Sequence, residues 1–277
     1  MAHREHGIFP AHDGLQLHWE LRAPEAPRAY VGLVHGYMDH AGRFAQVADF
    51  LVGQGFAAAA FDFRGHGKSE GRRGHCDRFD DFLEDLDRFW AWLRKRSGGL
   101  KTFLLAHSHG ALVASLWGAR NPLGLEAWVL SAPFLEFGFK PPPAKVVVSR
   151  LVGAAVPWLP VPHELNPADL TADLQAQRRV AGDPLYLRNA TPRWFTECVK
   201  AQARARQSAG AISIPTLMLS GGKDSIAQPQ AMRAFFDGLA TPQKKFVEYA
   251  EMVHEVLNEV GKERVWMEVA SWLTSRL

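Results

Sequence analysis

The sequence predicts an α/β fold, in which a mostly parallel central sheet of about eight strands is flanked by helices and carries an inserted helical cap. Three observations support this fold class. Short, nearly continuous apolar runs alternate with longer segments whose apolar residues recur at helical spacing. Such runs are typical of strands buried on both faces, as in parallel sheets covered by helices. One stretch, residues 134–210, lacks strand patterns and interrupts the alternation.

The first part of the chain is predicted to begin with an antiparallel hairpin. Residues 6–23 alternate polar and apolar side chains around the turn signal Asp13-Gly14. The elements that follow are a buried strand, a helix, a second buried strand, a glycine-rich polar loop and a long amphipathic helix, over residues 29–34, 43–55, 57–61, 62–69 and 77–97.

The next strand ends in a serine placed between small residues. Residues 102–107 form an apolar run, Ser108 follows, and residues 111–117 have the pattern of a helix. A strand–serine–helix junction is a nucleophile elbow, which lifts the hydroxyl clear of the sheet and points free helix N–H groups at its target. The positions two before and two after the serine must be small, and Ala106 and Gly110 occupy them.

After the elbow the alternation of strands and helices resumes. Strands are expected at 127–131, 215–220 and 245–249, and helices at 228–239 and 261–277. These elements complete the predicted sheet and its cover of helices.

The insertion, residues 134–210, is predicted to be a helical cap over the carboxyl ends of the strands, where open α/β folds bind ligands. Residues 1–133 and 211–277 then form the core. Prolines cluster at 141–143, and the run 144–159 is strongly apolar. This run is too short and too interrupted to cross a bilayer, which needs about 20 apolar residues.

The overall composition fits one large globular domain, or a domain with an insertion. The 277-residue chain has 32 basic and 29 acidic residues, and its net charge of +3 argues against a nucleic-acid partner. Its two cysteines, Cys76 and Cys198, cannot form a disulfide framework. The charged N-terminus lacks a following apolar core, so a secretory signal is not expected. The expected location is therefore the cytoplasm.

A serine nucleophile needs a base, and the base needs a carboxylate that fixes its tautomer. When the nucleophile sits on such an elbow, the order along the chain is Ser, then Asp or Glu, then His. Beyond the strand at 215–220 the only histidine is His254, and Asp224 comes just after that strand. Asp224 has the alternative role of capping the next helix, and Glu251 would serve only if its loop folded back. The poorer carboxylates, which lie in the predicted cap or in a helix, are Asp169, Asp173, Asp183 and Asp237.

The tetrahedral intermediate of such a reaction needs two hydrogen-bond donors for its oxyanion. One is expected to be the backbone N–H of His109, directly after the serine. The other is expected to be the N–H of Tyr37, in the loop after the strand at 29–34, where Gly36 permits a close backbone approach. His35 is expected to hold this loop through hydrogen bonds.

Three motifs together resemble the monoacylglycerol lipase and lysophospholipase branch of the α/β-hydrolases, of the serine aminopeptidase S33 type. They are residues 35–44, residues 62–69 and the Ser108 elbow, and the resemblance spans nearly the whole chain apart from the cap. The resemblance implies the α/β-hydrolase fold, with Asp224 as the acid and His254 as the base.

The resemblance also implies that the amides of Tyr37 and His109 form the oxyanion hole and that the cap holds an acyl chain. Three residues depart from the branch's pattern: Ala106 replaces the elbow glycine, Asp39 stands where glutamate is usual, and His109 stands where methionine or another apolar residue is common. The third departure places an imidazole beside the oxyanion, where it bears on pH dependence or leaving-group preference.

These inferences predict a serine hydrolase that cleaves carboxylic esters of medium or long acyl chains, most simply monoacylglycerols or lysophospholipids, through an acyl-enzyme on Ser108. The alternatives are a carboxylesterase or thioesterase acting on smaller acyl groups, and a non-catalytic binding protein on the same scaffold. A serine at the elbow excludes haloalkane- or epoxide-type chemistry, which needs a carboxylate there. No cofactor is implied, and no metal site is expected.

The expected partner is a small lipid or ester substrate, with no nucleic acid. A mildly basic chain with an apolar cap is compatible with transient contact with a membrane surface, and the sequence gives no indication of an oligomeric state. The role of His107 is left open, and His66 and Arg64 are expected to fix their loop rather than touch substrate. The serines interpreted as ordinary structural residues are Ser69, Ser115 and Ser131.

Overall fold

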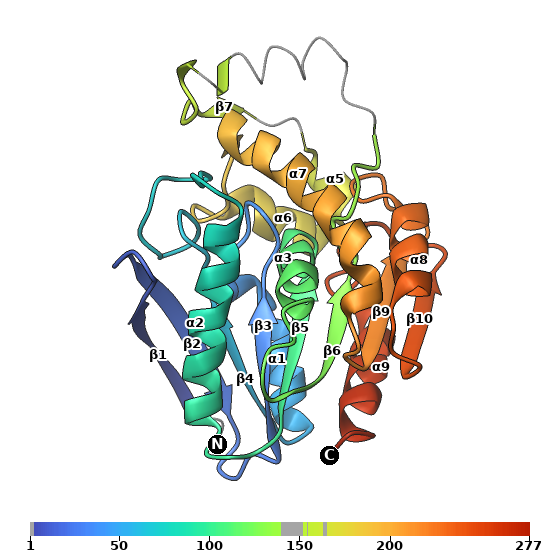
Figure 1. The fold of residues 1–277 in the computed structure, drawn as a ribbon. Helices are drawn as coiled ribbons and strands as arrows, with labels where there is room; N and C mark the ends of the chain where they lie inside the picture. The colour runs from blue at the N-terminus through green and yellow to red at the C-terminus, as the bar shows by residue number, and fades with distance from the viewer. Residues whose placement is uncertain (1–2, 140–151, 154, 163–164) are drawn as a thin grey trace.

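An eight-stranded sheet forms the centre of the molecule, with strand order β1-β2-β4-β3-β5-β6-β9-β10 (Figure 1). The computed structural model describes residues 3–139, 152–153, 155–162 and 165–277. The strands of this sheet are β1 (His3–Pro10), β2 (Gln16–Ala23), β3 (Ala29–Val34), β4 (Phe56–Phe61), β5 (Thr102–His107), β6 (Leu125–Ser131), β9 (Thr216–Gly221) and β10 (Lys244–Tyr249). The fold is therefore the α/β class that the sequence predicts.

The sheet is antiparallel at one edge and parallel elsewhere. β1 pairs with β2 and β2 with β4 in antiparallel register, whereas all pairs from β4 to β10 are parallel. From β3 the chain passes outward to β4 and then returns to the other side of β3 as β5. This reversal makes a topological switch point between β3 and β5, and ligands bind outside the carboxyl ends of strands at such points.

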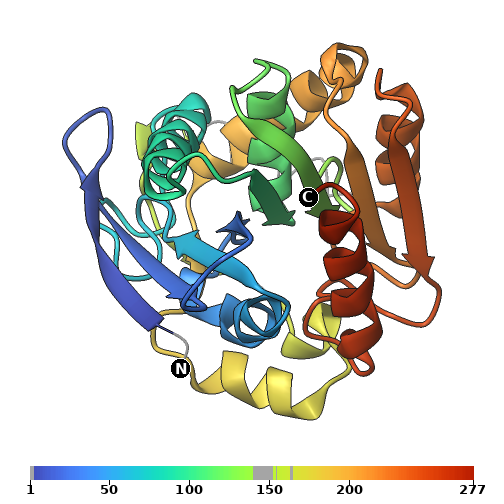
Figure 2. The same ribbon diagram turned by 90° about the horizontal axis from the view of Figure 1, so that it is seen from below.

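Helices cover both faces of the sheet, as Figure 2 shows. One face packs against α1 (Ala45–Gly53) and α9 (Lys262–Thr274), and the opposite face packs against α2 (Asp80–Arg96), α3 (His109–Gly118) and α8 (Pro229–Gly238). Alternate residues of the central strands β3, β4, β5, β6 and β9 enter the two separate apolar clusters, because side chains point to opposite faces in turn. These central strands are buried on both sides, which explains their nearly continuous apolar sequences, whereas the edge strands β1 and β10 are mostly exposed or half-buried.

Several helix boundaries differ from the sequence prediction by a few residues. The helix expected over residues 43–55 consists of a 3₁₀ turn, η1 (Ala41–Phe44), followed by α1. The helix expected from residue 111 already begins at His109, directly after Ser108. The elbow needs no spacer, because a single left-handed residue reverses the chain from strand into helix.

The segment 134–210 lies between β6 and β9, and its described part is mostly helical. It contains α5 (Pro167–Leu170), α6 (Leu174–Gly182), α7 (Pro192–Ser208) and the 3₁₀ turn η2 (Ala209–Ala211). No strand was expected here, yet Val161–Pro162 (β7) pairs with Asn189–Ala190 (β8). Each of these strands has two residues, which is too short to produce an alternating pattern.

Backbone contacts place this inserted segment over the carboxyl ends of the strands (Figure 1). The Leu187 N–H donates to the Met38 carbonyl after β3, and the Glu255 N–H, after β10, donates to the Leu170 carbonyl. The prolines at 141–143 and most of the apolar run 144–159 lie outside the described residues. Among the described helices, none combines the length and the apolar character that a membrane span requires.

The packing of α3 on β6 predicts the effect of a substitution at Gly118. A Cβ at this position would lie 2.3 Å from a ring carbon of Trp128. Gly118→Ala is therefore expected to lower the free energy of unfolding, measured by urea denaturation, by about 1–3 kcal/mol. The control is Gly53→Ala at the end of α1, where a Cβ meets nothing within 4 Å, and which should be neutral or slightly stabilising. A Gly118→Ala variant as stable as the wild type would contradict this packing.

Candidate active site

Ser108 stands alone between β5 and α3 in a strained conformation. Its φ is 53° and its ψ is −118°, a region that costs a non-glycine residue about 1–3 kcal/mol. The turn brings α3 so close to β3 that a Cβ on Gly110 would lie 2.4 Å from the His35 carbonyl oxygen. Ala106 is fully buried in β5, where the apolar core accommodates its methyl group. Glycine is thus required at 110, whereas alanine fits at 106.

The three predicted triad residues lie within hydrogen-bond distance of one another. His254 Nε2 is 2.8 Å from Ser108 Oγ, and His254 Nδ1 is 2.7 Å from Asp224 Oδ2. The side chains of His254 and Asp224 are almost completely buried. Residues separated by more than 100 positions in the chain therefore meet at the carboxyl ends of β5, β9 and β10.

Asp224 is oriented by the backbone that follows it. Its Oδ1 accepts the N–H groups of Ile226 and Ala227, each at 2.9 Å, which leaves Oδ2 for His254. These bonds lie before α8, whose N-cap is Gln228, so Asp224 does not cap that helix. A Cβ on Gly221 would lie 2.0 Å from the Val253 carbonyl oxygen, so this glycine allows the loop that carries the histidine to approach β9.

The surroundings of His254 favour its protonated form. Burial lowers the pKa of His254, but the charge and hydrogen bond of Asp224 and the charge of Glu255 outweigh it and raise the pKa above the ordinary value of 6.5. A raised pKa makes the imidazole a stronger proton acceptor toward Ser108. The Asp224 carboxylate also stabilises the imidazolium that proton transfer creates.

The two predicted oxyanion donors lie on either side of the nucleophile. His109 is the first residue of α3, where backbone N–H groups have no partner within the helix. Neither its N–H nor that of Tyr37 donates to an acceptor within the part of the chain that the structure describes. A Cβ on Gly36 would stand 3.8 Å from Ser108 Oγ, so a side chain at 36 would occupy the space beside the hydroxyl.

His35 makes hydrogen bonds at the start of the loop that carries Tyr37. Its Nδ1 lies 2.7 Å from the Gly36 carbonyl oxygen, and its Nε2 accepts the Phe63 N–H at 3.0 Å. These partners require a neutral ring with the proton on Nδ1. Burial lowers the pKa of His35 to about 4, and the ring therefore stays neutral at physiological pH.

The loop at 62–69 packs against the loop that follows β3 and carries Tyr37. Asp62 accepts the N–H of Ala41 at 2.6 Å and the N–H of Lys68 at 2.7 Å. Arg64 pairs with buried Asp85 through two bonds of 2.6 and 2.7 Å, and His66 bonds to the Arg64 carbonyl oxygen at 2.9 Å. Arg64 and His66 thus fix the loop, in agreement with the sequence prediction.

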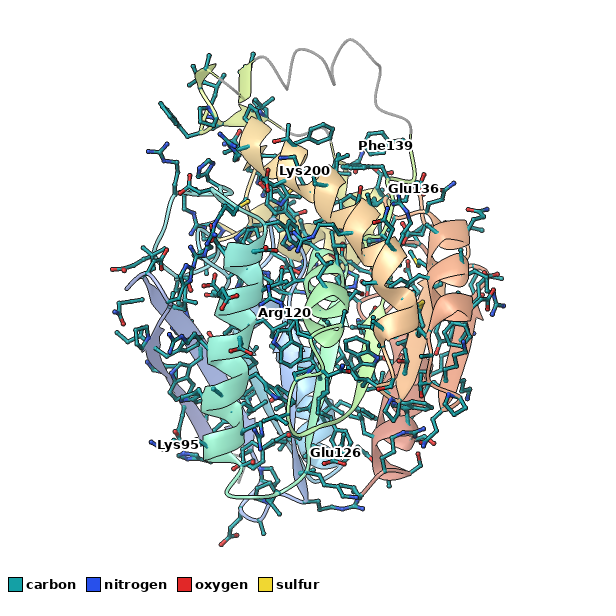
Figure 3. All side chains as sticks on the ribbon, in the orientation of Figure 1. Lys95, Arg120, Glu126, Glu136, Phe139 and Lys200 are labelled. Carbon is teal, nitrogen blue, oxygen red and sulfur yellow. The ribbon has the colours of Figure 1, made fainter. Side chains whose placement is uncertain are left out.

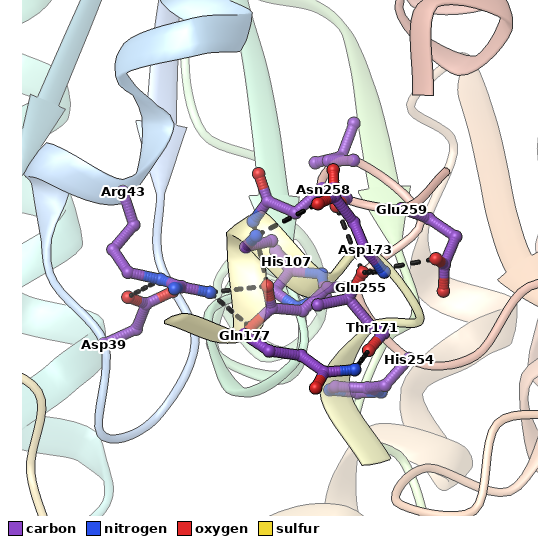
Figure 4. A network of polar contacts seen from close by, with 12 residues as sticks. Asp39, Arg43, His107, Thr171, Asp173, Gln177, His254, Glu255, Asn258 and Glu259 are labelled. Atoms are coloured by element: carbon purple, nitrogen blue, oxygen red, sulfur yellow. Dashed lines mark hydrogen bonds and ion pairs between the residues drawn. The ribbon is translucent and has the colours of Figure 1, made fainter. Parts of the chain in front are cut away.

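A buried group of charges behind His254 was not found from the sequence. Arg43 lies between two carboxylates, with Nη2 2.6 Å from Glu255 Oε1 and Nε 2.8 Å from Asp39 Oδ1 (Figure 4). Burial raises the pKa of Asp39 to about 6, because it outweighs the attraction of Arg43. His107 lies beside His254 with ring centroids 5.0 Å apart. The signals for this group were the i, i+4 spacing of Asp39 and Arg43 and a glutamate directly after the base.

The serines interpreted as structural have ordinary local partners. Ser69 Oγ donates to the Asp62 carbonyl oxygen at 2.6 Å, and Ser115 Oγ donates to the Ala111 carbonyl oxygen at 2.7 Å. Ser131 Oγ is 3.3 Å from His107 Nδ1.

Comparisons with known proteins find relatives along nearly the whole chain. The sequence profile of the family described as serine aminopeptidase, S33, matches residues 25–261. The chain is 30% identical to a monoacylglycerol lipase of Mycolicibacterium smegmatis, over 99% of this chain and 98% of the relative. It is 29% identical to phospholipase YtpA of Bacillus subtilis, over 90% and 95% of the two chains. The crystal structure of Paleococcus ferrophilus monoacylglycerol lipase superposes with a TM-score of 0.81 at 28% identity, and the match covers 100% of both chains.

Removal of the Glu255 charge tests its effect on the candidate base. Ser108 can react only while His254 is neutral, so its reactivity falls as pH drops through the His254 pKa. Glu255 contributes to raising this pKa, and Glu255→Gln should therefore shift the acid limb to lower pH. The measurement is the rate of inactivation by a sulfonyl fluoride as a function of pH.

The matched control is Glu251→Gln in the same loop. Glu251 is 58% exposed and pairs with Arg264, so solvent screens its charge from His254. The acid limb of the inactivation rate in Glu251→Gln should coincide with that of the wild type. An unmoved limb in Glu255→Gln would show that Glu255 does not tune the base.

Proposed function

Since the chain belongs to the serine aminopeptidase S33 family, in the monoacylglycerol lipase and lysophospholipase branch of the α/β-hydrolases, and is an ester hydrolase, we propose that its substrates carry medium or long acyl chains. Monoacylglycerols and lysophospholipids are the proposed substrate classes. The reaction passes through an acyl-enzyme on Ser108. The observation that carries the proposal is the continuous hydrogen-bonded chain from Asp224 through His254 to Ser108.

The proposed acylation step uses each of these groups in turn. Ser108 Oγ attacks the ester carbonyl carbon while His254 Nε2 takes its proton. The carbonyl oxygen becomes an oxyanion, which the amides of Tyr37 and His109 bind. The intermediate collapses, the ester C–O bond breaks, and His254 returns the proton to the departing alcohol. Asp224 keeps the His254 proton on Nδ1 and balances the positive charge.

Deacylation repeats these roles with water as the nucleophile. His254 takes a proton from water, the resulting hydroxide attacks the acyl carbon, and the oxyanion forms again in the same site. Collapse of this second intermediate releases the fatty acid, and the proton on His254 returns to Ser108 Oγ.

Aromatic contacts within the inserted segment support the proposal of an acyl-chain substrate. We propose that residues 134–210 form the cap and that residues 1–133 and 211–277 form the hydrolase core. Phe134 donates its N–H to the Ser108 carbonyl oxygen at 3.1 Å, and its ring lies 4.8 Å from that of Phe137. Phe137 in turn contacts Phe195 of α7 at 5.6 Å. These rings form an apolar surface that begins beside the nucleophile.

Exposed apolar side chains on the same segment support transient contact with a lipid surface. Phe139 lies at the end of the molecule that carries the segment (Figure 3) and is 52% exposed. Trp158 and Val161 are 48% and 45% exposed. Because large apolar side chains in water favour burial, these exposed residues suit contact with a membrane surface. We place the enzyme in the cytoplasm, which agrees with the free thiols of Cys76 and Cys198.

The first test removes the nucleophile. Ser108→Ala should lower turnover of 1-monooleoylglycerol by at least about 10³-fold, because the oxygen that forms the acyl-enzyme is absent. Released fatty acid gives the rate, and thermal unfolding confirms the fold. Ser271→Ala on the exposed face of α9 is the control and should match the wild type. Near-normal turnover by Ser108→Ala would refute the mechanism.

The second test distinguishes long-chain lipid substrates from small esters. Along a series of glycerol monoesters from acetate to palmitate, kcat/KM should rise by up to ~4-fold for each methylene that the pocket buries, because each buried methylene is worth about 0.8 kcal/mol. The matching lysophosphatidylcholines report headgroup preference. A maximum at two to four acyl carbons would instead identify a small-substrate esterase.

A further inference from the structure

One tryptophan of the inserted segment contacts the side chains of both residues whose amides are the proposed oxyanion donors. The Trp194 indole stacks on the Tyr37 ring, with centroids 3.5 Å apart and an interplanar angle of 11°. The Trp194 Nε1–H donates to His109 Nε2 at 3.4 Å. Tyr37 follows β3 and His109 opens α3, so these two residues come from different parts of the core and meet at α7.

His109 has a fixed charge state and a fixed tautomer in this contact. Burial lowers the pKa of His109 to about 3, so the ring is neutral. Because Nε2 accepts the indole N–H, the ring proton is on Nδ1. The ring is enclosed by the aromatic residues Tyr37, Phe63, Phe79, Phe82 and Trp194.

Within the described residues, His109 Nδ1 is buried and has no hydrogen-bond partner. A buried N–H without a hydrogen-bond partner costs free energy, because it has lost its bonds to water. An aliphatic or thioether side chain at position 109 would not carry this cost. Among the residues that the structure describes, the Trp194 indole is therefore the only hydrogen-bond partner of the His109 ring, and it comes from the inserted segment.

Trp194 is itself held rigidly. It lies in the first turn of α7, where its backbone N–H donates to the N-cap hydroxyl of Thr191 at 3.3 Å. The Thr191 hydroxyl donates to the Gly74 carbonyl oxygen at 3.2 Å, and the Tyr37 hydroxyl donates to the same oxygen at 2.6 Å. The stacked ring and the start of α7 therefore share one anchor in the core.

We propose that Trp194 is a positioning residue that orients the amides of Tyr37 and His109 toward the oxyanion, so that the inserted segment and the oxyanion hole act as one unit. The inference rests on the proposed function. Oxyanion donors act mainly in the transition state, and their alignment decides their contribution. Loss of Trp194 is accordingly expected to lower kcat and to leave KM nearly unchanged.

Two variants separate the contacts of Trp194. Trp194→Phe keeps a ring against Tyr37 but loses the N–H donor to His109, and Trp194→Leu loses both. With a short, soluble p-nitrophenyl ester, kcat should fall roughly 3- to 10-fold in Trp194→Phe and roughly 10- to 100-fold in Trp194→Leu, with KM within about 3-fold. Titration to completion with a fluorophosphonate, which modifies the nucleophilic serine once per active site, counts the working enzyme, so kcat is expressed per active site.

A transition-state analogue provides a readout that a structural role would not change. Ser108 adds to the carbonyl of an alkyl trifluoromethyl ketone, its proton passes to His254, and the ketone oxygen becomes an oxyanion. The inhibition constant should rise in the two variants by the same factors by which kcat/KM falls, because the analogue needs the same amides.

The control is Trp117→Phe on the same helix as His109. Trp117 is also buried, and it also loses one indole N–H bond, to Asp87 at 3.1 Å. Trp117→Phe should lower the melting temperature, while kcat per active site and analogue affinity stay at wild-type values. If both Trp194 variants fold and keep wild-type kcat and analogue affinity, or if Trp117→Phe loses as much kcat, the proposal is overturned. Failure of the wild type to hydrolyse the p-nitrophenyl ester would instead refute the proposed function, before Trp194 is changed.

Discussion

The hydrogen bond between His254 Nε2 and Ser108 Oγ is the contact on which the site depends. It requires the loop after β10 to reach the elbow after β5, and two glycines without room for a side chain permit this. Gly110 lets α3 approach β3, and Gly221 lets the histidine loop approach β9. The parallel arrangement of the strands brings their carboxyl ends to one edge, so the remaining distance is short enough for side chains to close.

Burial and charge together select one base among several histidines. Burial lowers the pKa of His35 to about 4 and those of His107 and His109 to about 3, so these rings stay neutral and serve as hydrogen-bonding or packing groups. His254 is equally buried, but Asp224 reverses the direction of its shift. Because pKa values that diverge within one site separate reacting from structural groups, this contrast supports His254 as the catalytic histidine.

Most of the fold, and the candidate residues of the triad, could be inferred from local patterns and their order in the chain. Apolar runs located the strands of the sheet, and the order Ser, Asp, His selected His254 and Asp224 because so few residues satisfied it. Trp194 and Glu255 could not be assigned in this way. Their roles depend on how the inserted segment and the histidine loop pack onto the core, and that packing has no periodic signal in the sequence. His109 was identified as unusual, but its partner lies 85 residues away.

The most direct test of the central claim is to locate the reactive side chain chemically. The folded protein is treated with a fluorophosphonate, which forms a phosphonyl ester with an activated serine and releases fluoride. It is then digested with trypsin, and the modified peptide is sequenced by mass spectrometry. The account predicts a single adduct on Ser108 that appears more slowly at acidic pH, where His254 is protonated. An adduct on Ser69, Ser115 or Ser131, or a folded protein that forms none, would contradict it.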